Sequence, residues 1–117
     1  MEREAFQPGE TIFQVGDDSD RAFLIVIGEV SARLPDGRTR SLGPGEMFGE
    51  MGLIDAMPRS ATIVANKYTV CASYTEAELL EAIRSNPDGA VDFIRGLIRR
   101  LRDANQAAQR GLPATRA

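Results

Sequence analysis

The residues best suited to chemistry lie in one glycine-rich segment, residues 45–62. Gly49 and Gly52 would let backbone approach a ligand closely, and a single helical turn beginning near Glu50 would point free amides outward as an anion site. A proline then ends the turn and presents Arg59. An arginine can donate two parallel hydrogen bonds to phosphate oxygens, whereas a carboxylate only accepts, which suits a sugar hydroxyl. The segment therefore offers a cation, an acceptor and oriented amides, which are the groups that a ribose with a cyclic phosphate needs. The alternative is that Glu50 and Arg59 form only a weak ion pair at the surface.

The rest of the composition excludes several kinds of catalytic site. The 117 residues include no histidine, so neither a Ser-His or Cys-His pair nor an imidazole metal ligand can form. The single cysteine, Cys71, lies in an apolar-rich run and is predicted to be a small core residue rather than a reactive thiol. We therefore expect no enzyme activity, no cofactor and no metal site.

Charge and hydropathy indicate the surroundings of the chain. The formal net charge is -3, and the apolar runs are too short to span a bilayer. The N-terminus lacks the basic and hydrophobic regions of a signal peptide. These features predict a cytoplasmic chain without a membrane span and without direct nucleic-acid binding.

Six strands are predicted in the first two thirds of the chain. Gly, Pro or Asp interrupts the sequence about every eight to twelve residues, and the segments between are mostly β-branched or alternating. These segments are residues 11–14, 22–27, 29–34, 38–42, 60–65 and 68–73. The pattern predicts a mainly β fold, either a sandwich or a barrel.

A hairpin is predicted within this β region, with its turn at residues 35–37. The turn sequence Pro-Asp-Gly is typical of a tight connection between two strands. Alternate residues of a strand share one face, and the sets expected to do so are Val30, Ala32 and Leu34 on the first strand and Arg38, Arg40 and Leu42 on the second.

Two helices are predicted after residue 74, where the period of the apolar residues changes from two to about 3.6. Thr75 and Glu78 match the capping-box pattern, so a first helix is expected to run from there to about Ser85. Asn86 then offers an N-cap, followed by a proline at the first helical position and an acid in the first turn. A second helix is therefore expected to start at this point.

The second helix has one apolar face along about three turns. Its members are Ala90, Phe93, Ile94, Leu97, Ile98 and Leu101. Such a face must be buried, either by packing on the barrel or, alternatively, in a helix that moves or pairs with another subunit. The arginines off this face are expected to be solvated: Arg95, Arg99, Arg100 and Arg102. One domain is predicted for residues 1–110, followed by a disordered tail at residues 111–117.

Several motifs together resemble the cyclic-nucleotide-binding domain family. Phe-Gly-Glu-Met-Gly-Leu at residues 48–53 and Pro-Arg-Ser-Ala-Thr at residues 58–62 are similar to the phosphate-binding cassette of that family. Supporting matches lie at residues 8–10, 12–13, 16–17, 23–30 and 42–46. The resemblance covers roughly residues 6–101. It implies a mainly β fold with flanking helices, a double-stranded β-helix (jelly-roll) barrel with C-terminal helices.

The resemblance also implies a role for the cassette residues. Glu50 would accept the ribose 2′-hydroxyl, Arg59 would pair with the cyclic phosphate, and Gly49 would lie against the sugar. Backbone amides around Gly52 and the two residues after the arginine would complete the phosphate shell. The full set of expected ligand-binding residues is Gly49, Glu50, Met51, Gly52, Leu53, Arg59, Ser60, Ala61, Ala32 and Arg40, the last two on strands that face the purine in the family.

Two cassette positions bear on rigidity and on the choice of ligand. Gly52 departs from the family pattern, where Ala or Ser is commoner, and is expected to loosen the short helix by up to about 1 kcal/mol. At Ser60 the family's cGMP-selective kinases often have Thr, its cAMP-selective kinases have Ala and bacterial cAMP binders have Ser. Its hydroxyl could also reach a guanine amino group. The implied ligand is cAMP, with cGMP as the alternative.

The function implied is that of a non-catalytic two-state sensor that signals through movement of its C-terminal helix. Its effector would be another chain or a fused domain, and a homodimer would form through that helix. The alternative is a degenerate domain of the same fold that serves as a protein interaction platform. Such a module could have lost Glu50 or Arg59, and both are present. A metal-dependent jelly-roll enzyme is disfavoured because there is no histidine.

Overall fold

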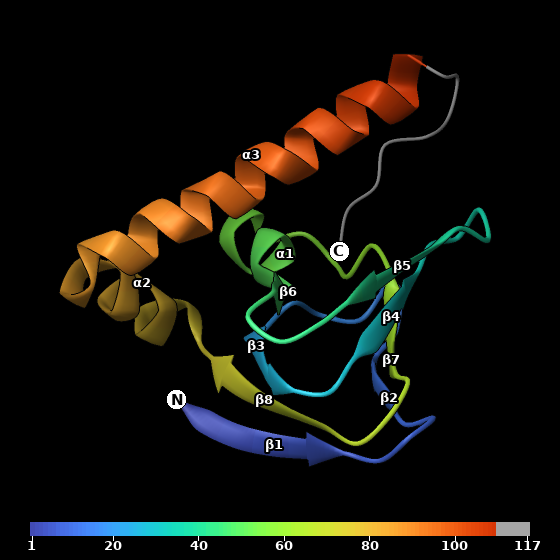
Figure 1. Cartoon of the computed structure of the whole chain (residues 1–117), viewed down its shortest axis with the longest axis horizontal. Helices are drawn as coiled ribbons and strands as arrows, with labels where there is room; N and C mark the ends of the chain where they lie inside the picture. Colours follow the sequence, from blue (N-terminus) through green and yellow to red (C-terminus); the bar gives the residue numbers. More distant parts are fainter. Residues whose placement is uncertain (110–117) are drawn as a thin grey trace.

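The computed structural model describes residues 1–109, and within the last helix it describes side chains up to residue 99 and at residue 102. In this part of the chain, β-strands precede and follow one short helix, and two further helices come last (Figure 1). The elements are β1 (Glu2–Phe6), β2 (Thr11–Phe13), β3 (Ala22–Ile27), β4 (Val30–Arg33), β5 (Thr39–Leu42), β6 (Met47–Phe48), α1 (Glu50–Asp55), β7 (Thr62–Ala65), β8 (Thr69–Tyr74), α2 (Glu76–Ser85) and α3 (Pro87–Gln109).

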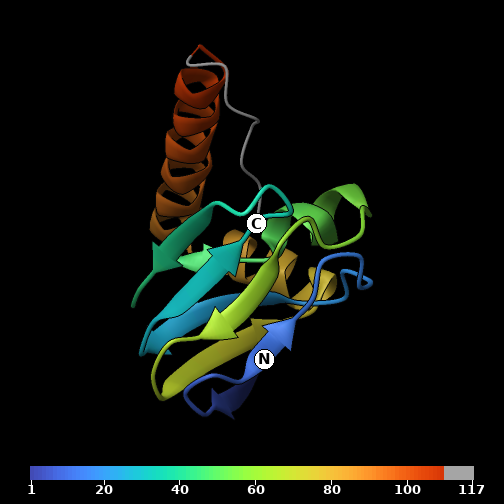
Figure 2. The same cartoon turned by 90° about the vertical axis from the view of Figure 1, so that its right-hand side faces the viewer.

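The strands form two antiparallel four-stranded sheets that face each other (Figures 1 and 2). The strand orders are β1-β8-β3-β6 in one sheet and β2-β7-β4-β5 in the other. Early and late strands thus alternate within each sheet, which is the arrangement of a jelly roll. The predicted mainly β jelly-roll with C-terminal helices is confirmed. The predicted barrel is not closed, because the strands of residues 1–109 remain in two separate sheets.

The core lies between the two sheets and receives residues from all eight strands and from Ala61, directly before β7. Its centre is an aromatic cluster of Phe13, Phe23 and Phe48, with ring centroids 5.1 to 6.0 Å apart. Ala32 and Cys71 are fully buried in the same core. The prediction that Cys71 is a small core residue is therefore confirmed.

The hairpin of β4 and β5 has the predicted register. Ala32 lies opposite Arg40, and Val30 lies opposite Leu42. Gly37 has a φ of 89° in the turn, a left-handed conformation that glycine adopts without steric cost. Val30 and Ala32 both point into the core, as their shared face requires.

Two strands were not predicted, and the ends of several others differ by one or two residues. β1 has the sequence Glu-Arg-Glu-Ala-Phe, in which only Phe6 is buried, so no apolar alternation marks it. It forms because it pairs along its whole length with β8. β6 has two residues and pairs with β3, which is too short a segment for a pattern to indicate.

The predicted capping signals of the last two helices are confirmed. Thr75 Oγ1 accepts a hydrogen bond from the amide of Glu78, whose carboxylate in turn accepts one from the amide of Thr75. Asn86 ends α2 and caps α3, because its side chain accepts a hydrogen bond from the amide of Gly89 at 3.0 Å. A single residue therefore separates the two helices, which also pack against each other.

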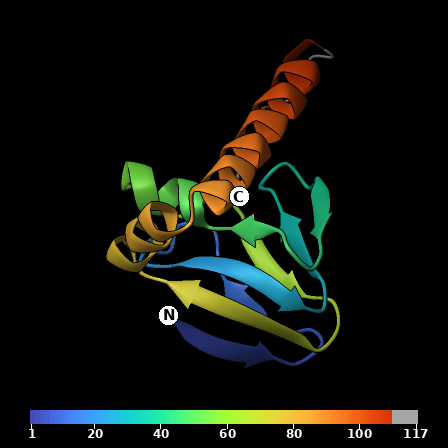
Figure 3. The same cartoon turned by 60° about the vertical axis from the view of Figure 1, so that its left-hand side comes forward.

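The apolar face of α3 is not buried as the simpler interpretation expected. α3 packs against α2 at its start and then extends away from the sheets (Figures 1, 2 and 3). Ile94 is 52% exposed and Ile98 is 45% exposed, while Phe93 and Leu97 are half-buried. Packing on the barrel is therefore wrong for much of this face. The predicted tail at residues 111–117 lies outside the described residues, and no helix within residues 1–109 is long and apolar enough to cross a membrane.

Candidate functional site

The site is built around the turn that joins β6 to α1. Gly49 occupies this turn with a φ of 81° and is the N-cap of α1. Because glycine has no side chain, α1 begins without a side-chain cap. A Cβ at this position would lie 2.6 Å from Nη1 of Arg59 and 3.3 Å from the carbonyl oxygen of Arg21. Glycine is thus required for the left-handed backbone and for the close approach of Arg59.

The predicted single helical turn near Glu50 is present as α1, which ends in a second left-handed residue. Ala56 has a φ of 55°, and the amide of Met57 donates a hydrogen bond to the carbonyl of Gly52 at 3.1 Å. This conformation turns the chain back toward the sheets, so that residues 57–59 run beside α1. The chain reversal places Arg59 next to Gly49, ten residues earlier in the sequence.

The Arg59 guanidinium is buried and is held from several sides. Nη1 donates a hydrogen bond to the carbonyl oxygen of Gly49 at 2.8 Å, and Nη2 donates one to the carbonyl oxygen of Arg21 at 2.6 Å. The guanidinium carbon lies 4.0 Å from the centroid of the Phe13 ring, which makes a cation–π contact. Nε is buried without a hydrogen-bond partner among the described residues.

Burial of this cation is only partly compensated. Burial lowers the pKa of Arg59, and the negative charges of Asp20 and Asp17 act in the opposite direction. Arginine remains protonated at neutral pH even when its pKa falls. Asp20 Oδ1 lies 3.9 Å from Nη2 and is 81% exposed, so solvent screens this ion pair strongly. The site therefore contains a buried positive charge that would attract an anion.

The other predicted cassette residues differ in where they lie. Glu50 is 1% exposed at the first position of α1. Ala61 is fully buried and Ser60 is half-buried, both directly after the arginine. Leu53 is buried against α2, in a cluster with Ala22 and Leu79. Met51 is half-buried, and Gly52 is buried within α1.

Ala32 and Arg40, the predicted purine-side residues, belong to the other sheet. They lie opposite each other on β4 and β5, whereas β6, which leads into Gly49, belongs to the sheet of β1, β8 and β3. Ala32 is 2% exposed and Arg40 is half-buried. The cassette and these two residues thus come from opposite sheets.

Three residues that contact the cassette were not assigned a role from the sequence. Phe13 lies under the Arg59 guanidinium, the carbonyl of Arg21 accepts from it, and Ser19 Oγ donates a hydrogen bond to the carbonyl of Met57 at 2.6 Å. Each is 38 residues or more from its partner in the sequence. No local pattern indicates such contacts, although Phe13 does lie within a motif of the resemblance.

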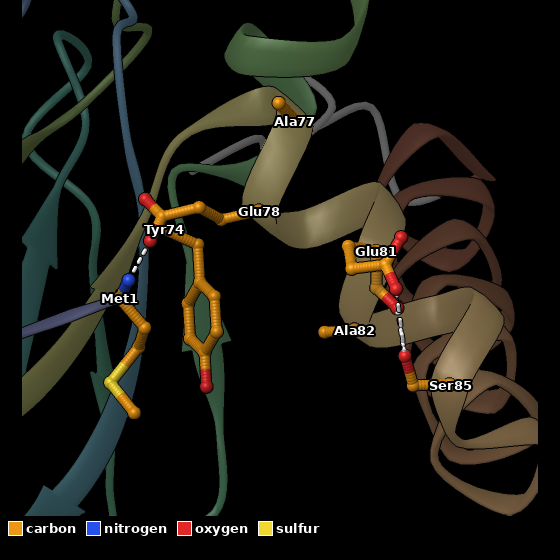
Figure 4. Close-up of a pocket in the computed structure, with 7 residues that line it drawn as sticks. All are labelled: Met1, Tyr74, Ala77, Glu78, Glu81, Ala82 and Ser85. Atoms are coloured by element: carbon orange, nitrogen blue, oxygen red, sulfur yellow. Dashed lines mark hydrogen bonds and ion pairs between the residues drawn. The ribbon is translucent and has the colours of Figure 1, made fainter.

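A separate pocket of about 450 Å³ lies between the N-terminus and α2 (Figure 4). Tyr74 and Met1 lie on one side of it, and Ala82 and Ser85 of α2 lie on the other. Its lining is largely apolar and contains none of the predicted ligand-binding residues. The described residues contain no group of three or more Cys, Asp or Glu side chains that could hold a metal ion.

Comparison with known families decides the assignment of this arrangement. A family model described as a cyclic nucleotide-binding domain matches residues 3–86. The chain belongs to the cyclic nucleotide-binding domain family. The match includes both sheets, α1 and α2, and the motifs of residues 48–53 and 58–62 lie inside it. The family resemblance expected from these motifs is confirmed.

Proteins similar to this cyclic nucleotide-binding domain include regulators of several kinds. A CRP-like cAMP-activated global transcriptional regulator of Mycobacterium tuberculosis is 34% identical over 105 residues, which cover 86% of this chain and 47% of the regulator. A cGMP-dependent protein kinase of Plasmodium berghei is 40% identical over 81 residues, which cover 69% of this chain and 9% of the kinase. The crystal structure of the Thermus thermophilus catabolite activator protein matches with a TM-score of 0.79 and 35% identity, covering 92% of this chain and 53% of that one. This chain spans about half the length of the two bacterial regulators.

Proposed function

We propose that this domain binds cAMP in preference to cGMP, without chemical conversion, and that Arg59 holds the cyclic phosphate. The observation that carries the proposal is the buried guanidinium of Arg59 next to the turn at Gly49. Both residues lie within the segment that matches the family model. Desolvation of a charge costs several kcal/mol unless an opposite charge compensates it. A cyclic phosphate would supply that charge.

Ligand binding would change the hydrogen-bond partners of Arg59. A guanidinium has five N–H donors, and two backbone carbonyls accept from the guanidinium of Arg59. The buried Nε donor has no acceptor among the described residues. A phosphate oxygen could accept from Nε while a second oxygen replaces one of the carbonyls. The exchange would shift the turn at Gly49, since that turn is one of the two groups now bonded to the side chain.

Glu50 is proposed to accept the ribose 2′-hydroxyl. An ionised carboxylate only accepts hydrogen bonds, so it can bind a hydroxyl group, whereas it repels the negative charge of a phosphate. Gly49 would lie against the sugar, and amides of Gly52 and of the two residues after Arg59 would complete the phosphate shell. Since helical amides in the first turn have no intrahelical partner, the start of α1 can supply such donors.

The base is proposed to lie near Ala32 and Arg40 on the opposite sheet. A ligand whose phosphate is at Arg59 and whose base is at β4 and β5 would contact both sheets. The relatives include both a cAMP-activated regulator and a cGMP-dependent kinase. Ser60 is the position proposed to discriminate between them, and its serine favours cAMP by the family pattern.

The signal is proposed to pass from the cassette to α3 through α2. Leu53 of α1 packs with Leu79 of α2, and α2 in turn packs against α3. A shift of α1 on ligand binding would therefore move α2, and Asn86 would transmit the movement to α3 without an intervening linker. Identical hydrogen exchange along residues 86–99 with and without ligand would contradict this route.

A homodimer is proposed to form through the exposed face of α3, with an effector in a fused domain or a second chain. Val91, Ile94 and Ile98 are each 45% to 52% exposed at helical spacing. Such a face is stable in water when a second helix covers it. Ile94→Glu should then lower the molar mass measured by light scattering; an unchanged dimer, or a monomeric parent, would contradict this interface.

The alternative remains a domain of the same fold that serves as a protein interaction platform. The calorimetric titration of the purified chain with cAMP, cGMP and AMP separates the two. Saturable binding of cAMP, weaker binding of cGMP and no binding of AMP are expected, and chromatography after incubation should recover cAMP intact. Binding of AMP as tight as that of cAMP would favour the platform.

A further inference from the structure

Ser19 and Gly52 lie against each other, Gly52 being buried within α1. A Cβ built on Gly52 would lie 2.4 Å from Oγ of Ser19, 3.1 Å from its Cβ and 3.0 Å from the carbonyl oxygen of Met57. The first distance is far below any contact that a methyl group can make. The hydroxymethyl group of Ser19 therefore takes the space of the side chain that residue 52 lacks.

The backbone gives no other reason for a glycine at this position. The glycines with left-handed φ values are Gly9, Gly16, Gly28, Gly37, Gly45 and Gly49, and Gly52 is not among them. It lies inside α1, where alanine is intrinsically more favourable. The close approach of Ser19 thus accounts for the glycine, and the expected loosening of α1 is opposed by this packing.

Ser19 also belongs to a loop that holds the backbone on both sides of Arg59. Its hydroxyl donates to the carbonyl of Met57 at 2.6 Å. In the same loop, the amide of Gly16 donates to the carbonyl of Arg59 and the amide of Arg59 donates to the carbonyl of Asp17, both at 2.8 Å. The loop between β2 and β3 is therefore fixed to α1 and to the arginine.

We propose that Ser19 is a positioning residue for Arg59, and that Ser19 and Gly52 form one fitted pair. The hydroxyl sets the distance between α1 and the chain that returns at Met57, and this distance places the guanidinium at Gly49. The ligand part of the proposal rests on the proposed function. The positioning itself does not, because it concerns contacts within the chain.

Three variants test the pair: Ser19→Ala, Gly52→Ala and the double variant. In the double variant the hydroxyl that would lie 2.4 Å from the new methyl is gone, and the remaining contacts, with the Met57 carbonyl oxygen and Cβ of residue 19, are 3.0 and 3.1 Å. Ser85→Ala is a matched control, since that hydroxyl also donates to a backbone carbonyl, at 2.8 Å in α2. Gly96→Ala is the control for a helical glycine, because a Cβ there meets nothing within 4 Å.

Affinity for cAMP by calorimetry is the first measurement. Ser19→Ala should weaken binding by about two- to twelve-fold, which is the full loss of one neutral hydrogen bond of about 0.5–1.5 kcal/mol. Gly52→Ala should weaken it more, and the double variant should bind more tightly than Gly52→Ala alone. If the loss of affinity in the double variant is simply the product of the losses in the two single variants, the pairing is overturned. If Gly52→Ala does not fold, the free energies of unfolding of Ser19→Ala and of the double variant decide: a double variant that folds supports the pairing, and a Ser19→Ala variant with the stability of the parent overturns it.

The Nε–H signal of Arg59 in a ¹⁵N spectrum is the second measurement, and it needs no ligand. The signal is assigned by its loss in Arg59→Lys. Ser19→Ala should shift it, while Ser85→Ala should not. A residue that merely stabilised the fold would leave this signal in place, and that result would overturn the positioning role. If the parent binds no cyclic nucleotide, the proposed function is wrong, and this signal still decides the role of Ser19.

Discussion

Replacing Arg59 by alanine should remove specific contacts within the protein, each with a typical energy. The side chain makes two hydrogen bonds to carbonyls, at 2.8 and 2.6 Å, and one contact with the Phe13 ring at 4.0 Å. A hydrogen bond from a charged donor contributes about 1.5–3 kcal/mol, and a cation–π contact about 0.5–2 kcal/mol. Burial of the cation costs several kcal/mol in the opposite direction. The free energy of unfolding should therefore fall by only about 1–3 kcal/mol.

The effect on the ligand should be larger, because the variant leaves a buried phosphate without its cation. Truncation of one partner of a buried, hydrogen-bonded charge pair costs about 2 to 5 kcal/mol. This corresponds to roughly thirty-fold to several thousand-fold in affinity for cAMP. Calorimetric titration measures the affinity, and urea denaturation measures the stability of the same preparation.

Two further variants make this test specific. Arg95→Ala removes an arginine whose side chain is 71% exposed on α3, and it should bind cAMP as the parent does. Arg59→Lys keeps the charge but not the fork of donors, so its affinity should lie between those of the parent and Arg59→Ala. Binding by Arg59→Ala as tight as that of the parent would refute the assigned role.

Three other predictions concern single residues. Glu50→Ala, which removes the acceptor, should lower the preference for cAMP over 2′-deoxy-cAMP by about tenfold or more, measured as a ratio of calorimetric affinities, and an unchanged ratio would exclude Glu50 as the 2′-hydroxyl acceptor. Thr75→Ala should lower the free energy of unfolding in urea by about 0.5–2 kcal/mol through loss of the α2 cap, whereas Thr75→Ser should retain most of it. Burial raises the pKa of the Cys71 thiol from 9.0 to about 11, so the folded state favours the protonated form. The free energy of unfolding should therefore fall as pH rises from about 9 to about 11, and a Cys71→Ala variant with the same pH dependence as the parent would contradict this.

Much of the fold could be predicted because its signals are local. The capping box at Thr75 and the N-cap at Asn86 lie within a few residues of the groups they satisfy. The turn at Gly37 fixes the pairing of Ala32 with Arg40. The cassette was found differently, through the resemblance of two short motifs, separated by four residues, to a known family. For the caps and the turn, sequence neighbours determine the structure.

What could not be predicted depends on contacts between distant segments. The partners of Arg59, namely Phe13 and the carbonyl of Arg21, come from strands or loops that only the fold brings together. β1 is a strand because of β8, and its own residues are mostly polar and exposed. The face of α3 had the correct helical period, but periodicity does not say which surface covers it. Ile94 and Ile98 are exposed because α3 extends beyond the sheets.

The calorimetric titration of the parent chain with cAMP tests the central claim most directly. AMP and cGMP are titrated separately for comparison. AMP has the same base and ribose but lacks the cyclic phosphate that Arg59 is proposed to hold. The account predicts saturable binding of cAMP, weaker binding of cGMP and no heat change with AMP. Absence of binding to either cyclic nucleotide would contradict it.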